Sequence, residues 1–334
     1  MATILATSRS FGGGGIDLVG DLERAGHTVL RGPSDHDLDA LRDSLAVADA
    51  WVAGTGPVTA AHLDAAPRLR VVARYGVGTE AVDVEAAAER GVLVTNTPGA
   101  NSDAVADHAV ALMLAALRSV VDGDRRVRTG DWTAVRGRQL GALTVGIVGF
   151  GRIGRGVARR LQGFGSRIVA ADPMLTDAQL REAGAEPIGF AEMARECDLI
   201  TLHAPGGQTL VDAAWLSTLS RPVVLVNTAR ADLVDEAALA AALRERRVAA
   251  YAADTLAGDT AASAGGGADA SALLAEDIAD RVTITPHLGA QTVEAVDGMG
   301  AIAVDNALAV LEGREAPNPV NSPDPAARRR LEDA

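Results

Sequence analysis

Short apolar runs alternate with helix-type patterns along the chain, and they do so in two successive series. In the first hundred residues, strands are predicted at Thr3–Thr7, Thr28–Leu30, Ala50–Ala53, Arg70–Ala73 and Val92–Thr95. Helices are predicted between them at Asp17–Ala25, Leu38–Leu45, Thr59–Ala65 and Val84–Arg90. This alternation is typical of a parallel sheet with crossover helices.

A long helical stretch, Ser102 to Leu117, separates the first series from the second. The second series contains predicted strands at 143–148, 167–171, 199–202, 223–227, 249–253 and 282–285. The last helical stretch, Thr292 to Leu311, has no further strands beside it, so we expect it to return to the first series. The predicted fold class is therefore α/β, with two doubly wound parallel-sheet domains. Residues 1–98 and 289–334 form a flavodoxin-like domain, and residues 99–288 form a Rossmann domain inserted in it.

The turn after the first strand of the second series carries the most informative motif. Gly149, Gly151 and Gly154 form a G-x-G-x-x-G turn that leads into a predicted helix over 152–164. In a dinucleotide site the first two glycines let the backbone approach a pyrophosphate, and the third lets the helix pack on the strand. Asp172 ends the next strand, where a carboxylate accepts hydrogen bonds from ribose and repels a 2'-phosphate, which favours NAD over NADP. The alternative is a glycine-rich turn in an ordinary βαβ unit, which does not require this context.

Composition excludes several kinds of reaction and partner. All 31 basic residues among the 334 are arginine, so lysine Schiff bases are excluded. The net charge of −13 argues against nucleic acid and anionic membranes as partners, and an anionic substrate then needs a local arginine cluster. The histidines, acids and Cys197 show no metal-ligand spacing, so no metal is expected.

Three features indicate a cytoplasmic protein. A single cysteine, Cys197, excludes a disulfide within the chain, and its place before an apolar strand favours a small buried side chain over a reactive thiol. No stretch approaches the ~18 apolar residues of a membrane helix. The first residues do not form a signal-peptide pattern.

Chemically competent side chains follow three strands of the second series. Arg230 follows the strand 223–227, Asp254 and Asp259 follow 249–253, and His287 follows 282–285. Open α/β sheets bind ligands at this carboxyl edge. Taken singly, each residue could be structural. Together they offer a guanidinium that clamps a carboxylate, a histidine that transfers a proton, and a carboxylate that orients the histidine. Beside a nicotinamide, this set suits hydride transfer at a carbon next to a carboxylate.

With these residues, the chain resembles the NAD-dependent D-2-hydroxyacid dehydrogenases, in particular their phosphoglycerate dehydrogenase-like branch. The resemblance extends from Arg74-Tyr75-Gly76-Val77-Gly78 to Pro319-Val320-Asn321. Between them lie the segments 96–102, 105–108, 203–205, 227–230, 234–236 and 285–289, together with the glycine turn and Asp172. The family is commonly a homodimer through its cofactor domain, which implies that Ser102 to Leu117 lies in an interface.

The resemblance also implies residue roles. Arg230 would bind the substrate carboxylate and polarise the keto oxygen, His287 would be the acid/base, and Asp259 would be its carboxylate partner. The implied cofactor residues are Gly149, Gly151, Arg152, Ile153, Gly154, Asp172, His203, Pro205, Thr228, Asp254, His287 and Gly289. The implied substrate-binding residues are Arg74, Val77, Gly78, Asn101, Arg230 and His287.

The chain departs from the family pattern at several positions. Asp259 stands where the family usually has glutamate, Ala231 replaces the usual glycine, and Asp107 replaces a glutamate. The stretch 53–56, where phosphoglycerate enzymes carry a phosphate-binding arginine, has no cation. Arg9 and Arg74 are candidates to replace it, and an unphosphorylated substrate is the alternative. The sequence also ends before any appended regulatory domain, so feedback through such a domain is not expected.

Two other functions remain open from the sequence. One is an NAD(H)-sensing scaffold of the co-repressor kind. The departures from the family pattern at residues 231 and 259 favour this function, whereas the presence of Arg230 and His287 argues against it. The other is a formate- or phosphite-type dehydrogenase. Formate enzymes typically pair their histidine with glutamine and phosphite enzymes use a lysine, and this chain has an acid and no lysine.

Overall fold

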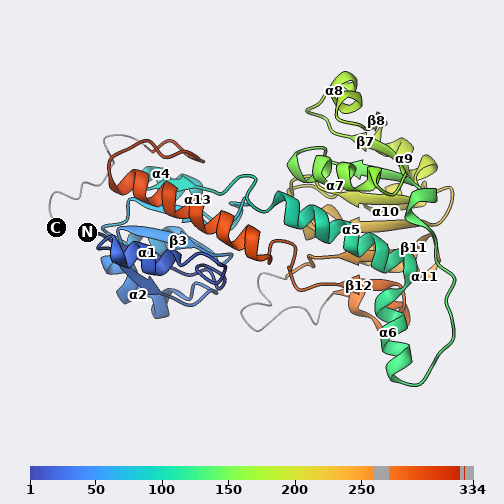
Figure 1. Ribbon diagram of the computed structural model, residues 1–334, viewed down its shortest axis with the longest axis horizontal. Helices are drawn as coiled ribbons and strands as arrows, with labels where there is room; N and C mark the ends of the chain where they lie inside the picture. The colour runs from blue at the N-terminus through green and yellow to red at the C-terminus, as the bar shows by residue number, and fades with distance from the viewer. Residues whose placement is uncertain (259–270, 324–326, 328–334) are drawn as a thin grey trace. The chain divides into compact units, whose positions relative to one another are not determined.

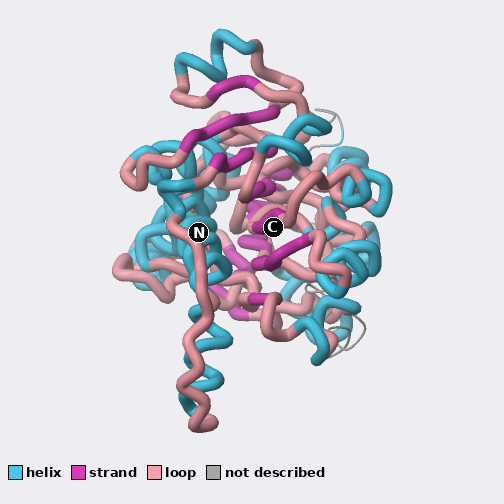
Figure 2. The backbone as a smooth tube through the Cα atoms, turned by 90° about the vertical axis from the view of Figure 1, so that its right-hand side faces the viewer, coloured by secondary structure: helices cyan, strands magenta, loops and turns pink. Residues whose placement is uncertain are grey.

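The chain folds into two compact units in a computed structural model that describes residues 1–258, 271–323 and 327. The first unit comprises residues 1–101 and 290–334, and the second comprises residues 102–289 (Figure 1). The boundaries expected from the sequence were 98/99 and 288/289. The α/β class is confirmed, because both units contain a parallel sheet with helices on both sides of its strands (Figure 2).

The first unit has a five-stranded sheet in the order β2-β1-β3-β4-β5. Its strands are β1 (Thr3–Ala6), β2 (Thr28–Arg31), β3 (Ala50–Ala53), β4 (Val71–Arg74) and β5 (Leu93–Thr95). Its helices are α1 (Leu18–Arg24), α2 (Leu38–Val47), α3 (Ala60–Asp64), α4 (Val84–Glu89) and α13 (Val293–Leu311). Helix α13 packs on β3 and β4, so the last helix does return to the first sheet (Figure 1).

The second unit has a seven-stranded parallel sheet in the order β12-β11-β10-β9-β6-β7-β8. Its strands are β6 (Thr144–Val148), β7 (Arg167–Ala171), β8 (Glu186–Pro187), β9 (Leu199–Leu202), β10 (Val223–Asn227), β11 (Val248–Ala253) and β12 (Val282–Ile284). Its α-helices are α5 (Ser102–Arg118), α6 (Val120–Arg128), α7 (Arg152–Gln162), α8 (Asp177–Glu182), α9 (Phe190–Glu196), α10 (Ala213–Ser217) and α11 (Glu236–Arg244). Short 3-10 turns are η1 (Leu140–Ala142), η2 (Ala231–Leu233), η4 (Ala272–Leu274) and η5 (Glu276–Ile278).

Local sequence accounts for many helix starts. An aspartate immediately before the helix accepts a hydrogen bond from a backbone N–H three residues later, which satisfies one of the free donors of the first turn. Asp17, Asp37, Asp83, Asp212 and Asp235 cap α1, α2, α4, α10 and α11 in this way.

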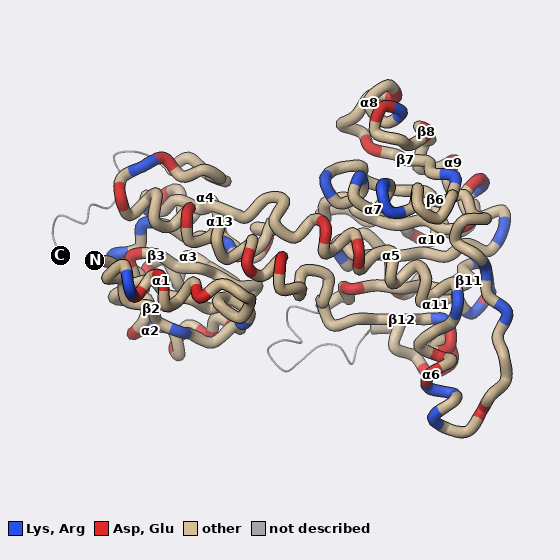
Figure 3. Tube along the Cα trace, viewed as in Figure 1, with Lys and Arg blue, Asp and Glu red and all other residues tan. Residues whose placement is uncertain are grey.

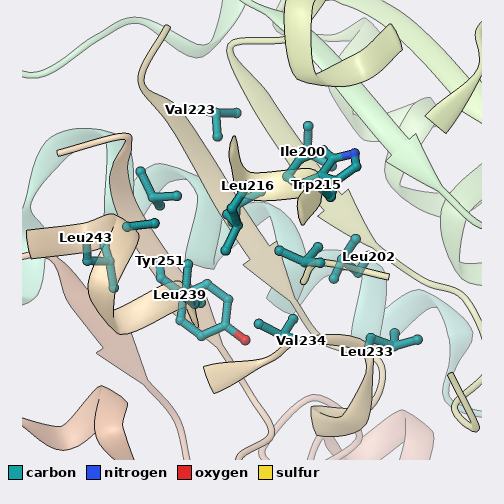
Figure 4. Packing of buried hydrophobic residues seen from close by; sticks show 14 of the residues in the cluster. Ile200, Leu202, Trp215, Leu216, Val223, Leu233, Val234, Leu239, Leu243 and Tyr251 are labelled. Atoms are coloured by element: carbon teal, nitrogen blue, oxygen red, sulfur yellow. The ribbon is translucent and has the colours of Figure 1, made fainter. Parts of the chain in front are cut away.

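The central strands β3, β4, β9 and β10 are buried along their whole length, which is why they read as continuous apolar runs, whereas the edge strands β2, β8 and β12 are only partly buried. In the second unit one face packs against α9, α10 and α11, where Tyr251, Leu239, Leu216 and Ile200 meet (Figure 4). Cys197 is 1% exposed in this core, and burial raises the pKa of its thiol to about 12, so it is the buried, unreactive side chain expected.

Several elements of the second unit were not predicted, namely strand β8, helices α6 and α8 to α11, and the 3-10 turns. Strand β8 has two residues, too few to show a pattern. Helix α6 buries none of its residues within the chain and was not predicted from the sequence. Among the described residues, no single helix is long and apolar enough to cross a membrane, although the bent pair α5 and α6 passes that test jointly.

Candidate active site

The glycine turn lies at the carboxyl end of β6, beside the carboxyl end of β9. Strand order reverses between these two strands, which is where open α/β sheets bind their ligands. Gly149 has φ +85°, and a Cβ there would lie 2.6 Å from the carbonyl carbon of His203. A Cβ on Gly154 would overlap the carbonyl oxygen of Gly149. Any side chain at either position would therefore displace backbone. A Cβ on Gly151 would meet open space, which leaves room for a ligand to approach.

Asp172 is joined to the glycine turn. Its carboxylate accepts hydrogen bonds from the backbone N–H groups of Phe150 at 2.7 Å and Met174 at 2.9 Å. The side chain at 172 is half-buried, so it holds the turn and remains accessible to a ligand. A carboxylate at the end of the second strand is the group that an adenosine ribose requires, and the residues present fit a dinucleotide.

Arginines gather on the helix that follows the turn. Helix α7 begins at Arg152 and also carries Arg155, Arg159 and Arg160, and blue segments lie along this helix in Figure 3. Arg159 and Arg160 lie in its last turn and pair with Asp103 and Asp107. The local positive potential at its start therefore comes from the free N–H groups, Arg152 and Arg155. An anionic cofactor would meet a favourable field here.

His203 follows β9 and is neutral. Burial lowers the pKa of its imidazole to about 3. Its Nε2 lies 3.0 Å from the Thr201 hydroxyl and its Nδ1 lies 3.5 Å from the Thr228 hydroxyl. Pro205 lies two residues further along the same loop and is exposed. The segment 203–205 therefore lies beside the glycine turn, as a cofactor-lining role requires.

Arg230 and His287 lie at the same edge of the sheet. Parallel strand β11 is paired with β10 on one side and β12 on the other, with Asn227 opposite Ala253 and Ala253 opposite Ile284. Arg230 and His287 each come three residues after these aligned positions. The two side chains therefore belong to loops at one edge, separated by the loop that begins with Asp254.

Buried Asn227 shapes the Arg230 turn. Its Nδ2 donates to the Arg230 carbonyl at 2.8 Å, and its Oδ1 accepts from the Ala229 N–H at 3.0 Å. Ala231 begins η2, a right-handed turn that alanine adopts without strain, so the loss of the family glycine has no backbone cost here.

Asp254 anchors the His287 turn, a role that the sequence did not reveal. Its Oδ1 accepts from Leu288 N–H at 2.8 Å and from the Thr285 hydroxyl at 2.5 Å, and its Oδ2 accepts from Gly289 N–H at 2.7 Å. These bonds enclose His287, whose φ of +56° is rare for a non-glycine residue. The carboxylate therefore holds the candidate acid/base in a conformation that the backbone would not favour unaided.

His108, on α5, completes this cluster. Its Nε2 lies 2.9 Å from the Thr285 hydroxyl and 3.3 Å from Asp254 Oδ1. Burial would raise the pKa of Asp254, but hydrogen bonds from His108, Thr285 and the two backbone N–H groups outweigh it, and the pKa is lowered. Asp254 is thus ionised at neutral pH. Asp107-His108 was noted only as part of a motif, because its partners lie far along the chain.

The other predicted site residues lie in the first unit, except Asp259, which is outside the described residues. Arg74 ends β4 and is buried, and its Nη1 donates to the Tyr75 carbonyl. Val77 and Gly78 follow in the next loop, and Asn101 precedes the crossing into the second unit. The expected role of Asp259 lies outside the described residues. Within 1–258, 271–323 and 327, no three His, Cys, Asp or Glu side chains gather as metal ligands would.

Comparison with known proteins identifies a family. Residues 110–289 match the family model for the D-isomer specific 2-hydroxyacid dehydrogenase, NAD binding domain. The D-3-phosphoglycerate dehydrogenase of Mycobacterium leprae is 39% identical over 269 residues, which cover 79% of this chain and 49% of that protein. The glyoxylate reductase of Korarchaeum cryptofilum is 36% identical over 276 residues, which cover 80% of each. The chain thus spans about half the length of the curated phosphoglycerate dehydrogenases that it matches.

Solved structures show the same fold. The TT0316 protein from Thermus thermophilus superposes with a TM-score of 0.82 at 33% identity, covering 96% of this chain and 100% of that one. The NADPH-dependent glyoxylate/hydroxypyruvate reductase of Sinorhizobium meliloti superposes with a TM-score of 0.80 at 28% identity, covering 96% and 98%.

Proposed function

This chain belongs to the D-isomer specific 2-hydroxyacid dehydrogenase family, and we propose that it is an NAD-dependent oxidoreductase acting on a small D-2-hydroxy acid or its 2-keto acid. One observation carries the proposal above all others. Arg230 and His287 leave the same sheet edge from which the dinucleotide turn projects, on the strands that flank β11. A carboxylate-binding cation, a proton-transfer group and a cofactor site are therefore grouped in one unit.

The residues have separable roles in the reduction direction. Bound NADH supplies hydride to the carbonyl carbon of the keto acid. Arg230 binds the substrate carboxylate and stabilises the negative charge that develops on the keto oxygen. His287 donates a proton to that oxygen, and Asp259 is proposed to keep it protonated. Asp172 selects NAD by repelling a 2'-phosphate. On the substrate side we propose Arg74, Val77, Gly78 and Asn101.

The test is oxidation of NADH with glyoxylate, hydroxypyruvate and phosphohydroxypyruvate. We expect turnover with at least one of them, and the comparison of the last two decides whether the substrate is phosphorylated. Tight NADH binding without turnover on any of the three would refute the enzyme and favour an NAD(H)-sensing scaffold.

Two substitutions test the assigned roles. Arg230→Ala should lower kcat/KM about 1,000-fold, since it removes the charge-stabilising group. His287→Ala should lower kcat by roughly 100- to 10,000-fold, while fluorescence quenching shows that NADH still binds. Arg244→Ala is the matched control, because Arg244 pairs with exposed Asp277 away from the carboxyl ends of the strands. Wild-type turnover by His287→Ala would show that another group transfers the proton.

We further propose that the protein is a cytoplasmic homodimer formed through its cofactor domain. Helix α6 has nine residues and buries none of them. A helix of this length is too short to be stable without a packing partner. Exposed apolar side chains gather on this helix and the segment after it, at Val120, Val121, Val127, Trp132 and Val135. A second copy covering α6, together with part of α5, would bury them. Light scattering should give a dimer mass, and Trp132→Asp should shift it toward a monomer; a wild-type monomer at micromolar concentration would refute the interface.

A further inference from the structure

A buried polar network joins three loops at the carboxyl edge of the first sheet. The strand order β2-β1-β3-β4-β5 has its reversal between β1 and β3, so the chain leaves these two strands in opposite directions. Open α/β sheets bind ligands at such a point. Thr7 directly follows β1, and Gly54 directly follows β3. The network centres on the Thr7 hydroxyl.

The hydroxyl of Thr7 has three partners from two other loops and a strand. It accepts from Trp51 Nε1–H at 2.9 Å and from Gly54 N–H at 3.3 Å, and it lies 2.6 Å from His36 Nε2. His36 Nδ1 lies 3.1 Å from the Pro57 carbonyl, which can only accept. Nδ1 therefore carries the proton, and Nε2 accepts from the Thr7 hydroxyl. The hydrogen bonds run from Trp51 through Thr7 and His36 to Pro57, and in each of them only one of the two groups can be the donor.

A second histidine extends the network. His62 Nδ1 accepts from Thr59 N–H at 3.2 Å, and its Nε2 lies 2.7 Å from the His36 carbonyl. These contacts of the ring thus tie the loop after β2 to the start of α3. Thr7 and His36 are each 1% exposed and Trp51 is 0% exposed. Burial lowers the pKa of His36 to about 4, and the charged or titratable groups that face it are His62, Arg74 and Asp35.

Backbone strain and close contacts show that this arrangement is strongly specified. His36 has φ +59°, a left-handed conformation that is uncommon for a side chain with a Cβ. A Cβ on Gly56 would lie 2.5 Å from the His36 Cγ, and a Cβ on Gly54 would lie 2.9 Å from the Thr7 carbonyl oxygen. Strained residues held by their surroundings cluster at functional sites. The loops after β1, β2 and β3 are thus pressed together at one place.

We propose that Thr7 and His36 are positioning residues for the substrate. By joining the loops after β1, β2 and β3, they hold this edge of the first sheet, which Arg74 also faces, as a single rigid surface. The inference rests on the proposed function, because Arg74 is one of the proposed substrate residues. Neither side chain is accessible, so both act through the loop backbone and not by touching the keto acid. No other part of the described chain ties these three loops with side-chain hydrogen bonds so completely.

The test separates positioning from plain stability. Thr7→Val keeps the shape of the side chain but removes the hydroxyl, and Thr7→Ser restores it. We expect Thr7→Val to raise the KM for the keto acid about tenfold, with kcat and the NADH dissociation constant changed less than twofold. Thr7→Ser should return KM to near the wild-type value. Gly56→Ala, whose methyl group would push the His36 ring, should raise KM in the same way without removing a hydrogen-bonding group.

The matched control lies at the opposite edge of the same sheet. Asp49 precedes β3 and is fully buried, and it accepts from Thr3 N–H at 2.7 Å and from Arg68 at 3.0 Å. Asp49→Asn should lower Tm and leave KM unchanged. If Thr7→Val and Gly56→Ala lower Tm as the control does but leave KM unchanged, the network is structural only and the inference is wrong. Lack of wild-type turnover on every keto acid would instead overturn the proposed function, and this inference with it.

Discussion

Asp254→Asn is the most informative single change, because the two oxygens of this carboxylate are committed to different backbone donors. Oδ1 faces the N–H of Leu288 at 2.8 Å, and Oδ2 faces the N–H of Gly289 at 2.7 Å. An asparagine has only one oxygen. Whichever way its amide turns, the NH₂ group points at a backbone N–H that can no longer be satisfied.

The magnitude follows from burial. The Asp254 side chain is 4% exposed, so water cannot replace the lost acceptor. An unsatisfied buried donor costs about 1–3 kcal/mol, and weakening the remaining bonds by removing the charge adds roughly 1 kcal/mol. We expect the free energy of unfolding of the second unit to fall by about 3 kcal/mol, which lowers Tm by roughly 10 °C for a domain of this size.

Activity should respond separately, because the lost bonds hold the turn that carries His287. A misplacement of about 1 Å can reduce the rate roughly 100-fold, so kcat should fall by that order. Titration with NADH distinguishes two roles for Asp254. An unchanged dissociation constant indicates action through His287, and a weakened one indicates contact with the nicotinamide carboxamide.

Thr285→Val is the control for this experiment. It removes one hydroxyl from the cluster but leaves the carboxylate and both backbone donors in place, so it should cost only about 1 kcal/mol. If Asp254→Asn unfolds at the wild-type temperature and keeps the wild-type kcat, the carboxylate does not hold the turn and the reasoning fails.

Three other outcomes follow from the geometry. Gly154→Ala should abolish NADH binding by calorimetry, because its Cβ would overlap the Gly149 oxygen; binding at wild-type strength would show that the turn can relax. Asp172→Ser should reduce the preference for NADH over NADPH in kcat/KM by roughly tenfold or more, since the charge that repels a 2'-phosphate is lost; an unchanged ratio would place discrimination elsewhere. His36 has a folded-state pKa of about 4, below its ordinary value, so the unfolded chain binds more protons between pH 6.5 and 4. The contribution of neutral His36 to the free energy of unfolding is complete above pH 6.5. As the pH is lowered through this window, the free energy of unfolding should fall by about 1.4 kcal/mol per pH unit. Urea titrations of wild type and His36→Asn should differ in this slope, and equal slopes would remove His36 from the acid response.

The fold class could be predicted because it rests on local patterns. Strands in the middle of a parallel sheet are buried on both faces, so each of them reads as a short apolar run. The glycine turn could also be predicted, since the backbone at Gly149 and Gly154 leaves no space for a side chain. Helix α6 could not, because none of its residues is buried within the chain.

The polar clusters required the tertiary structure. Thr7 meets His36 and Trp51, which lie 29 and 44 residues away, and Asp254 meets Leu288, which lies 34 residues away. Nothing in the local pattern near Thr7 or Asp254 signals these partners. They come together because strand order brings the ends of β1 and β3, and of β11 and β12, side by side.

The amino-acid sequence by itself determined the fold class, most of the strands and the place of the dinucleotide turn, and it supplied the candidates for binding an acid and transferring a proton. Tertiary structure decided which buried donors and acceptors pair, and hence that Asp254 holds the turn of His287 and that Thr7 and His36 join three loops. The physical reason is that burial and periodicity are properties of a few neighbouring residues, whereas a hydrogen bond depends on the position of two groups that only the folded sheet brings within about 3 Å of each other.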